Sequence, residues 1–320
     1  MNKEVGSKIS VCLLVYNHAH LIESTLASVQ KQTLSNYEII VSDDCSTDDT
    51  WTVLKKISEN DPRIRCIQTP SNLGMPGNAN FAVSQSSRPY IALLHHDDIY
   101  RDDLLEKWGD VMERNATVSY VFNPYDTLNA QVHYGPRFNE EILDGPWFLE
   151  NHLFARWGCP VRGTAMIRRS SWNQIGGMRT MFGLLADVDM WMRLAALGPV
   201  GYVNEPLIAI RQDRPDVYPR EYKSDSWSWS RRRYLYEIHA LNRLNYYNLH
   251  SLIGRLKWLK FRIRLSIETS KWLTYAVIRK KHHIIKDAGN SETLYDMFPL
   301  IVYRKFIIFF LDVKMKFGNC

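Results

Sequence analysis

The stretch Lys8-Ile9-Ser10-Val11-Cys12-Leu13-Leu14-Val15-Tyr16 is an almost unbroken apolar run that ends at Asn17. A run of this length without alternation is typical of a strand buried on both faces of a parallel sheet. Apolar residues at helical spacing follow from Leu21 to Gln32. The chain is therefore expected to begin with a buried strand, a polar loop and a helix.

The same unit recurs through the first hundred residues. Further strands are expected at Glu38–Ser42, Ile64–Gln68 and Tyr90–Leu94, with helices ending near Ile57 and spanning Asn78–Ser86, the latter after a turn-rich loop at Pro70–Gly77. Regular alternation of strand and helix predicts a doubly wound α/β sheet, mixed but mostly parallel.

Polar clusters follow three of these strands directly, namely Asn17, Asp43–Asp44 and His95–Asp98. In open parallel sheets, ligands bind in the crevice at the carboxyl ends of the strands. These clusters are therefore expected to converge on one site.

Beyond Arg101 the alternation loosens. Helices are expected at Leu104–Arg114, Ser171–Gly176 and Asp187–Ala196, strands at Val118–Asn123, Thr164–Arg168 and within Val200–Ile210, and irregular structure over residues 123–158. After Asp216 the sequence is helical in pattern and rich in Trp, Tyr, Arg and Lys. This predicts a catalytic domain over residues 1–220 and a helical, basic extension over 221–320.

Charge and cysteine content bear on whether the protein binds a membrane surface and on the redox state of its compartment. The 320 residues carry a net charge of +6, and most of the basic surplus lies between Arg231 and Lys286. This stretch is either a set of solvated basic helix faces or a surface that docks on anionic lipid. Phe298–Phe310 is too short and interrupted for a membrane span and suggests a monotopic anchor. The five scattered cysteines fit a reducing compartment.

Three acidic clusters are candidates for metal binding, nucleotide binding or catalysis. The carboxylates of Asp97 and Asp98 would repel each other unless a cation, hydrogen bonds or solvent relieve the repulsion. Their oxygen atoms are ligands that suit magnesium or manganese. Alternatively, Asp98 could cap the following helix. Asp43 and Asp44 could hold a base or ribose, or shape a turn. Asp187, in Asp187-Val188-Asp189, could be a general base, or an acid favoured by the helix dipole.

Several other classes of protein are disfavoured. Zinc would require more His or Cys ligands than His95 and His96. Neither GxxxxGK[ST] nor GxGxxG follows the first strand, which argues against P-loop enzymes and dehydrogenases. A nucleotidyltransferase would normally carry a basic, glycine-rich loop where Asn17-His18-Ala19-His20 stands. No zinc-finger, homeodomain or RNP-type pattern accompanies the positive charge, so nucleic acid is not an expected partner.

Five motifs, in order, resemble those of the family 2 glycosyltransferases, which have the GT-A fold. They are Ile9–Asn17, Val41–Asp48 (similar to DDGSTD), Asn72-Leu73-Gly74 with Asn78–Asn80, Leu94–Asp98 (similar to DxDD) and Ala186–Leu194 (similar to EDxDLWLRL). The likeness covers about residues 8–215.

The resemblance implies roles for particular residues. The donor nucleotide would be bound by Val15, Tyr16, Asn17, Asp43, Asp44, Asn72, Gly74, Asn78 and His96. A manganese or magnesium ion would be bound by Asp97, with His95 in the place of the first acid of the motif, Asp98 beside it, and Asp213 where relatives often carry a histidine. Asp187 would be the catalytic base, with Asp189 as the alternative. Gly163, Thr164, Met166, Trp191 and Arg193 would lie on the acceptor side.

The function implied is inverting transfer of a sugar from a UDP or dTDP sugar to a hydroxyl of a lipid-linked saccharide. Such proteins build O-antigen or capsule at the cytoplasmic face of a bacterial membrane, as peripheral proteins. Ala186 and His95 replace acids of the family motifs, which motivates the alternative of a non-catalytic sugar- or nucleotide-binding relative. The sequence does not identify the sugar, the linkage or the oligomeric state.

Overall fold

The computed structural model describes residues 2–128, 133–135, 138–157, 159–211 and 225–279. The chain divides into two compact units, the first ending at Val217 and the second beginning at Tyr218. Each unit is described by itself below.

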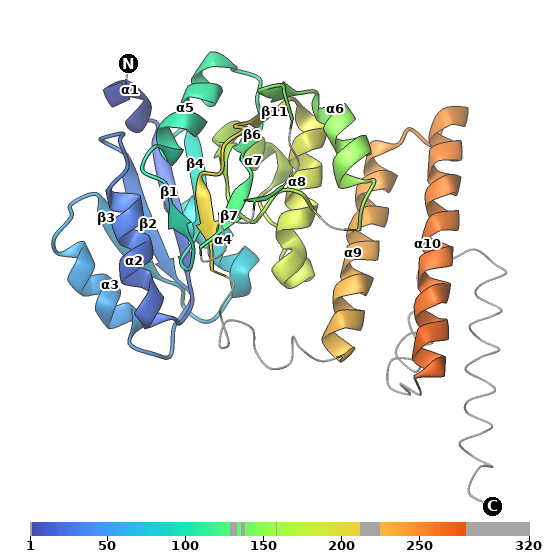
Figure 1. Ribbon diagram of the computed structural model, residues 1–320, viewed down its shortest axis with the longest axis horizontal. Helices are drawn as coiled ribbons and strands as arrows, with labels where there is room; N and C mark the ends of the chain where they lie inside the picture. The colour runs from blue at the N-terminus through green and yellow to red at the C-terminus, as the bar shows by residue number, and fades with distance from the viewer. Residues whose placement is uncertain (1, 129–132, 136–137, 158, 212–224, 280–320) are drawn as a thin grey trace, which may run out of the picture. The chain divides into compact units, whose positions relative to one another are not determined.

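A mixed sheet forms the centre of the first unit (Figure 1). Its strand order is β3-β2-β1-β4-β10-β6-β11-β9, and β1 to β4 are parallel, whereas β10 runs antiparallel between β4 and β6. The strands are β1 (Ile9–Val15), β2 (Glu38–Asp43), β3 (Ile64–Gln68), β4 (Tyr90–His95), β6 (Tyr120–Phe122), β9 (Ile142–Leu143), β10 (Ala165–Arg168) and β11 (Val200–Tyr202). The predicted mixed, mostly parallel α/β sheet is confirmed.

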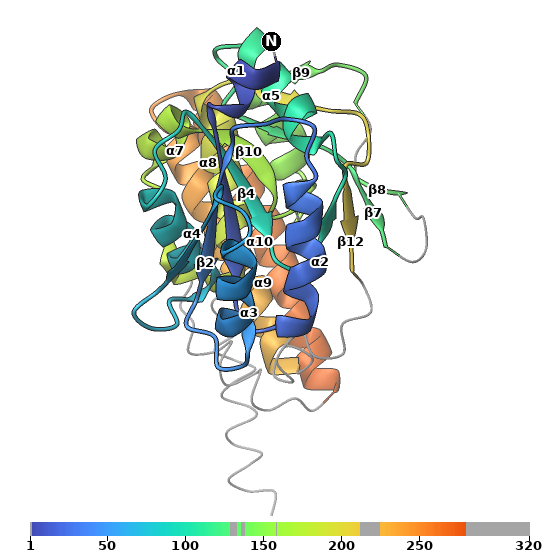
Figure 2. The same ribbon diagram turned by 90° about the vertical axis from the view of Figure 1, so that its left-hand side faces the viewer.

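Helices cover both faces of this sheet, with α2 on one side and α4 and α7 on the other (Figure 2). Every residue of β1 is buried, as its apolar run predicts. Alternate β1 residues join the core formed with α2, α3 and α5. The helices are α1 (Asn2–Gly6), α2 (Ala19–Gln30), α3 (Thr50–Ser58), α4 (Gly74–Ser84), α5 (Leu104–Arg114), α7 (Arg169–Ile175) and α8 (Ala186–Leu197).

Helix α4 begins four residues earlier than predicted, at Gly74 rather than Asn78. The turn residues of Pro70–Gly77 predict a loop. Pro76 nevertheless lies in the first turn of α4, where a missing backbone N–H has no intrahelical partner to lose. The early start places Asn78 inside the helix and against the sheet.

The region expected to be irregular, residues 123–158, contains strands and helices, and two of its strands pair with strands from outside it. A second sheet has the order β5-β12-β7-β8, formed by β5 (Ile99–Tyr100), β12 (Ile208–Ile210), β7 (Tyr125–Thr127) and β8 (His133–Tyr134). Helix α6 (Gly145–Phe148), a π-helix (Leu149–Leu153) and a 3₁₀-helix (Thr180–Leu185) complete the unit. The single strand expected within Val200–Ile210 is two strands in different sheets, because residues between Tyr202 and Ile208 carry the chain from one sheet to the other.

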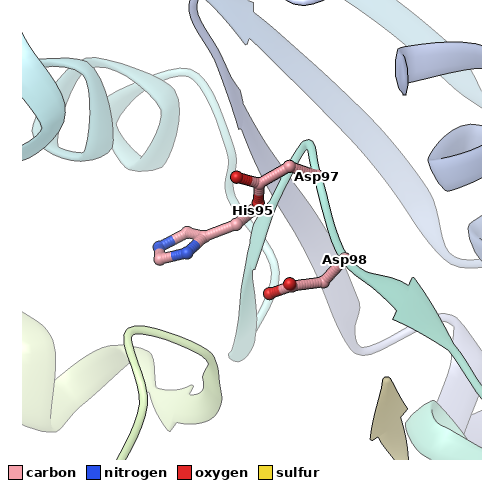
Figure 3. Close-up of side chains that lie close together, drawn as sticks. All are labelled: His95, Asp97 and Asp98. Carbon is pink, nitrogen blue, oxygen red and sulfur yellow. The ribbon is translucent and has the colours of Figure 1, made fainter. Parts of the chain in front are cut away.

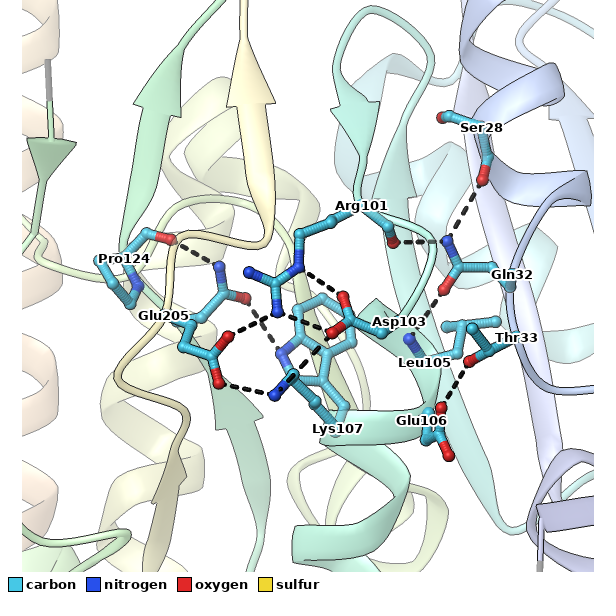
Figure 4. Close-up of polar contacts among 12 residues, drawn as sticks. Ser28, Gln32, Thr33, Arg101, Asp103, Leu105, Glu106, Lys107, Pro124 and Glu205 are labelled. Atoms are coloured by element: carbon cyan, nitrogen blue, oxygen red, sulfur yellow. Dashed lines mark hydrogen bonds and ion pairs between the residues drawn. The ribbon is translucent and has the colours of Figure 1, made fainter. Parts of the chain in front are cut away.

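A polar network supports the connection between the two sheets (Figure 4). The Arg101 guanidinium pairs with Asp103 and with Glu205, and the Lys107 ammonium lies 2.6 Å from the Glu205 carboxylate. The Gln32 side chain donates to the Arg101 carbonyl and accepts from the Leu105 N–H. These contacts join α2 and the start of α5 to the segment that leads into β12. The ion pairs are partly exposed, so each contributes little alone.

In the part of the second unit that the structure describes, residues 225–279, the chain forms helices α9 (Asp225–Tyr246) and α10 (Leu252–Ile278). The Arg232 guanidinium lies 4.1 Å from the centroid of the Trp272 ring, and the Arg243 guanidinium lies 4.2 Å from that of Phe261. These contacts pair the start of α9 with the end of α10, so the helices form an antiparallel hairpin. Within the described residues, no helix combines the length and the apolarity that crossing a bilayer requires. Phe298–Phe310 lies outside the described residues.

Asn78→Ala should destabilise the first unit by about 1–3 kcal/mol, because Asn78 is buried and its amide bonds to both β1 and β2. The change leaves the Ser42 hydroxyl and two strand carbonyls without these partners. Urea unfolding followed by tryptophan fluorescence measures the effect. Asn60→Ala removes only an exposed amide contact within a helix end and serves as the control. Equal midpoints for the two variants would contradict this role of Asn78.

Candidate active site

The carboxyl ends of β2, β1 and β4 meet at one edge of the sheet. The register pairs Val15 with Asp43 and Leu14 with His95. The loops that follow these strands therefore start side by side. The expected convergence of Asn17, the Asp43–Asp44 pair and the His95–Asp98 cluster is confirmed.

The turns after β1 and β2 hold each other in place. Asn17 and Cys45 both have positive φ, 56° and 59°, which is uncommon for residues other than glycine. The Asn17 N–H donates to the Ser46 hydroxyl at 2.7 Å, and the Thr47 N–H donates to the Asn17 side-chain oxygen at 3.0 Å. Asn17 is thereby fixed at the edge of the site, while the neighbouring Tyr16 side chain is exposed.

Asp43 and Asp44 are buried and accept hydrogen bonds from the turns around them. The Asp43 carboxylate accepts from the Ser46 hydroxyl and from the Gln68 amide, the latter at 2.8 Å. The Asp44 carboxylate accepts from the Thr69 hydroxyl and the Leu73 N–H, at 3.0 and 2.8 Å. Burial raises the pKa of Asp44 even though these donors lower it. Within the protein, both carboxylates therefore shape turns, which is the second of the two roles that the sequence suggests for them.

The Asn72–Gly74 turn lies beside these carboxylates through the Leu73 N–H. The exposed Asn72 side chain accepts from the Gly74 N–H at 3.0 Å, which forms an Asx turn at the start of α4. Asn78, also expected at the nucleotide, is instead engaged with β1 and β2 and is 2% exposed. Its side chain acts on the site by holding these strands together.

Two histidines connect the β1 turn to the β4 turn. His18 Nδ1 and His96 Nε2 are 2.7 Å apart, and the rings stack with their centroids 5.0 Å apart. His96 Nδ1 lies 3.0 Å from the Leu14 carbonyl oxygen, which can only accept, so this nitrogen carries a proton. The resemblance to the family implies a place for His96 at the nucleotide but no role for His18. The sequence feature that could have pointed to His18 is the pair of histidines in Asn17-His18-Ala19-His20.

His95, Asp97 and Asp98 form a group with the chemistry of a divalent cation site. One potential ligand atom from each lies within 4.8 Å of the others, and Figure 3 shows the three side chains close together at the end of β4 and on the turn that follows it. Both aspartates are buried. Asp98 does not cap the next helix, since Asp103 is the N-cap residue of α5. Asp213 lies outside the described residues.

The two aspartates at the start of α8 have different environments. Asp189 is fully buried, with its carboxylate 3.1 Å from the Arg179 guanidinium and 2.8 Å from that of Arg193. Asp187 is only partly buried, and one of its carboxylate oxygens accepts from the Val188 N–H at 2.8 Å. Asp189 is thus occupied by two arginines, whereas Asp187 is the more accessible of the two.

The segment from Cys159 to Gly163 runs between Asp187 and the cation-type group. Burial raises the pKa of the Cys159 thiol, and the nearby Asp187 carboxylate raises it further. At the other end, Gly163 packs directly against the His95 ring. Cys159 is not among the residues predicted at the site, because nothing in its local sequence pattern indicates that it lies near Asp187.

The other residues expected on the acceptor side are largely internal. Met166 is a fully buried β10 residue paired with Ala92. Trp191 is fully buried, with its ring centroid 5.0 Å from that of Tyr120. Arg193 donates to the Ile175 and Gly177 carbonyls. Thr164 is 3% exposed. Such side chains can affect an acceptor only through the residues they support.

Comparison with known proteins identifies the family. The sequence model of the family described as "Glycosyl transferase family 2" matches residues 10–176. TuaG of Bacillus subtilis, a glycosyltransferase assigned to teichuronic acid biosynthesis, is 30% identical over 73% of this chain and 90% of that protein. WfgD of Escherichia coli, named as a UDP-Glc:α-D-GlcNAc-diphosphoundecaprenol β-1,3-glucosyltransferase, is 33% identical over 38% of this chain and 47% of its own length.

A solved structure agrees with the sequence comparison. The fold of S. aureus TarS in complex with UDP-GlcNAc matches with a TM-score of 0.60 at 18% identity, over 75% of this chain and 67% of that one. At this identity the match shows the fold alone, and it confirms the expected GT-A fold. The chain therefore belongs to glycosyltransferase family 2 and is a glycosyltransferase.

Proposed function

We propose that the protein transfers a sugar, with inversion, from a uridine diphosphate sugar to a hydroxyl of a lipid-linked saccharide during synthesis of a bacterial cell-surface polysaccharide. The observation that carries this proposal is the arrangement around Cys159–Gly163. This segment has the cation-type group His95, Asp97 and Asp98 at one end and the accessible Asp187 carboxylate at the other. A leaving diphosphate and an attacking hydroxyl need these two kinds of group on opposite sides of the anomeric carbon.

The donor nucleotide would lie along the edge formed by the β1 turn, the Asp43–Asp44 pair and the Asn72 turn. Tyr16 and Asn72 offer exposed surface there, and the interlocked Asn17 turn holds it rigid. A preformed edge avoids the cost of ordering the loops on binding. The UDP-GlcNAc bound to TarS and the UDP-glucose in the name of WfgD support uridine as the base.

The diphosphate would be bound through a divalent cation held by Asp97, with Asp98 and His95 beside it. The mutual proximity of these ligand atoms and the burial of both carboxylates fit such an ion, since two adjacent buried carboxylates repel each other unless a cation relieves them. The ion would supply neutralisation of the charge that develops on the departing nucleoside diphosphate.

Asp187 would act as the general base. Its carboxylate takes the proton of the acceptor hydroxyl while the acceptor oxygen forms a bond to the anomeric carbon and the bond from that carbon to the diphosphate oxygen breaks. Attack from the face opposite the leaving group inverts the configuration. Asp189 is not accessible to an acceptor hydroxyl, because it is fully buried and its carboxylate is occupied by ion pairs with Arg179 and Arg193.

The proposed class of acceptor, a lipid-linked saccharide, is inferred from the names of two relatives. TuaG is assigned to teichuronic acid synthesis, and the name of WfgD specifies a sugar carried on diphosphoundecaprenol. A lipid-linked saccharide is held at a membrane, so a surface that binds lipid would bring the enzyme to its acceptor.

Helix α10 has the features of such a surface. Its exposed apolar side chains follow helical spacing and include Leu252, Leu256, Leu259, Ile263 and Ile267. Exposed cations lie among them, at Arg255, Lys260 and Arg264, and Glu268 is the sole acidic residue of the helix. An apolar stripe beside basic residues binds the interface of an anionic bilayer. We therefore propose peripheral association with the inner face of the plasma membrane.

Asp187→Asn should lower kcat by about 100- to 10,000-fold, because the amide cannot accept the hydroxyl proton. Binding of UDP should not change. The measurement is transfer rate with saturating donor, beside UDP affinity. Asp189→Asn is the comparison: loss of a buried charge between two arginines should instead cost about 3–5 kcal/mol of stability. Full transfer by the Asp187→Asn protein would overturn the assignment of the base.

Calorimetric titration of UDP, dTDP, GDP and CDP should show binding of UDP that requires manganese or magnesium. Asp97→Asn should abolish this metal-dependent binding, because the carboxylate that anchors the ion is lost. Asp102→Asn changes an exposed aspartate in the same stretch and should bind like the unaltered protein. Metal-independent UDP binding, or unchanged binding by Asp97→Asn, would contradict the proposed donor site.

The protein should co-sediment with vesicles containing phosphatidylglycerol and much less with pure phosphatidylcholine, and added salt should weaken the association. Leu259→Asp with Ile263→Asp should abolish binding, because charge is placed on the apolar stripe. Lys55→Gln with Lys56→Gln removes two cations from α3 and serves as the control. Binding that survives the α10 changes would argue against this surface.

A further inference from the structure

Arg162 projects from the segment that runs between the proposed base and the cation-type group. Val161 is 2% exposed, and Gly163 is packed against the His95 ring, whereas Arg162 between them is exposed. In an extended chain, successive side chains point to opposite sides. Because its two neighbours face inward, the Arg162 side chain leaves the segment on the solvent side.

The Tyr125 ring supports the Arg162 guanidinium on one face. The guanidinium carbon Cζ lies 5.1 Å from the centroid of the ring, which is within the range of a cation–π interaction. Stacking of this kind fixes the plane of the guanidinium, whereas its N–H groups lie in that plane and remain available to donate. Tyr125 belongs to β7, which is paired with β8 and β12. The ring therefore supports a fork of donors from a fixed element of the fold.

Arg162 differs in its partners from the arginines around α8. The guanidinium groups of Arg179 and Arg193 are both paired with the buried Asp189 carboxylate. Among the residues that the structure describes, no carboxylate or carbonyl accepts a hydrogen bond from Arg162. A planar guanidinium with its donors available binds phosphate or carboxylate oxygens through two parallel hydrogen bonds. Arg162 is therefore suited to an anionic group of a ligand.

The place of Arg162 and Tyr125 in the fold favours the acceptor over the donor nucleotide. β10 and β6 lie on the side of β4 opposite to β1 and β2. Arg162 precedes β10 and Tyr125 follows β6, whereas the proposed nucleotide edge lies at the ends of β1 and β2. Arg162 is three residues from Cys159, which lies near Asp187, and three extended residues span at most about 10 Å. An anion at Arg162 would thus be close to the hydroxyl that the base deprotonates.

We propose that Arg162, oriented by Tyr125, binds the diphosphate that joins the acceptor sugar to its lipid. The proposal rests on the lipid-linked acceptor of the proposed function. In a sugar carried on a lipid diphosphate, a single sugar ring separates the phosphates from the hydroxyl that is glycosylated. Arg162 is accordingly a specificity-determining residue, which favours a diphosphate-linked saccharide over a free one and directs the acceptor hydroxyl toward Asp187.

Calorimetric titration of geranyl diphosphate into the full-length protein tests the proposal, with UDP and manganese at saturation so that the donor site is filled. This compound carries the diphosphate and the first part of an isoprenoid lipid, without a sugar. The unaltered protein should bind it while UDP stays bound. Arg162→Gln should weaken the binding by about 10- to 100-fold, as loss of a charge-assisted hydrogen bond does, and should leave UDP affinity unchanged. Absence of binding beside UDP, or equal binding by the variant, overturns the proposal.

Matched substitutions separate the charge of Arg162 from its support. Arg156→Gln removes another exposed arginine from the same connection and should not change the affinity. Tyr125→Leu should weaken binding severalfold because the guanidinium loses its support, whereas Tyr125→Phe keeps the ring and the affinity. In the Arg162→Gln background, Tyr125→Leu should have little further effect. Equal losses in both backgrounds would contradict the orienting role of Tyr125.

Other sources of negative charge give different results. Methyl β-glucuronoside carries a carboxylate and no phosphate. If it binds, geranyl diphosphate does not, and Arg162→Gln abolishes the binding, the ligand is an acidic sugar and the proposal is wrong. Weaker UDP binding by Arg162→Gln, with geranyl diphosphate unaffected, would assign the residue to the donor diphosphate instead.

Failure of this proposal can be distinguished from failure of the proposed function. Metal-dependent UDP binding without binding of geranyl diphosphate leaves the donor site standing and removes only the role of Arg162. If the unaltered protein binds neither compound, both proposals are wrong. Circular dichroism checks the folding of each variant, and Arg162→Gln decides the matter if Tyr125→Leu does not fold.

Discussion

The hydrogen-bonded ladder of β2, β1 and β4 is the constraint on which the rest of the first unit depends. These strands are buried on both faces, so their backbone N–H and C=O groups have no water to bond and must pair with each other. Parallel pairing in one register then places the ends of all three strands at the same edge. Most donor-site groups lie at these strand ends or on the turns that leave them, and the Asn72–Gly74 turn after β3 is joined to them through Asp44. Residues far apart in sequence therefore share a site.

The turns themselves are rigid because they bond to each other. Asn17 is joined to Ser46 and Thr47, the Asp44 carboxylate holds the Leu73 N–H, and His18 lies against His96. Buried polar groups that find partners in neighbouring loops fix those loops relative to one another. The site is thereby organised before any ligand arrives, and much of its polar chemistry serves this organisation.

Identical residue types consequently have different uses at the start of α8. Asp187 and Asp189 are two positions apart, and both occupy the first turn, where the helix dipole favours an acid. Two residues correspond to about 200° around the helix axis. Asp189 is therefore directed inward to Arg193 and Arg179, whereas Asp187 stays at the surface of the site. The proposed division into base and structural acid follows from this difference in direction and burial.

The sequence by itself determined the parallel sheet, the edge on which the polar clusters converge, and the family, because apolar runs and the order of motifs are local patterns. It could not place the start of α4, the second sheet, or the roles of Asn78, Trp191 and Arg193, whose side chains are taken up by partners distant in sequence. The opposition of Gly163 and His95 likewise exists only once β10 pairs with β4. Local patterns specify elements, but only packing decides which polar side chains are satisfied within the protein and which are left to face a ligand.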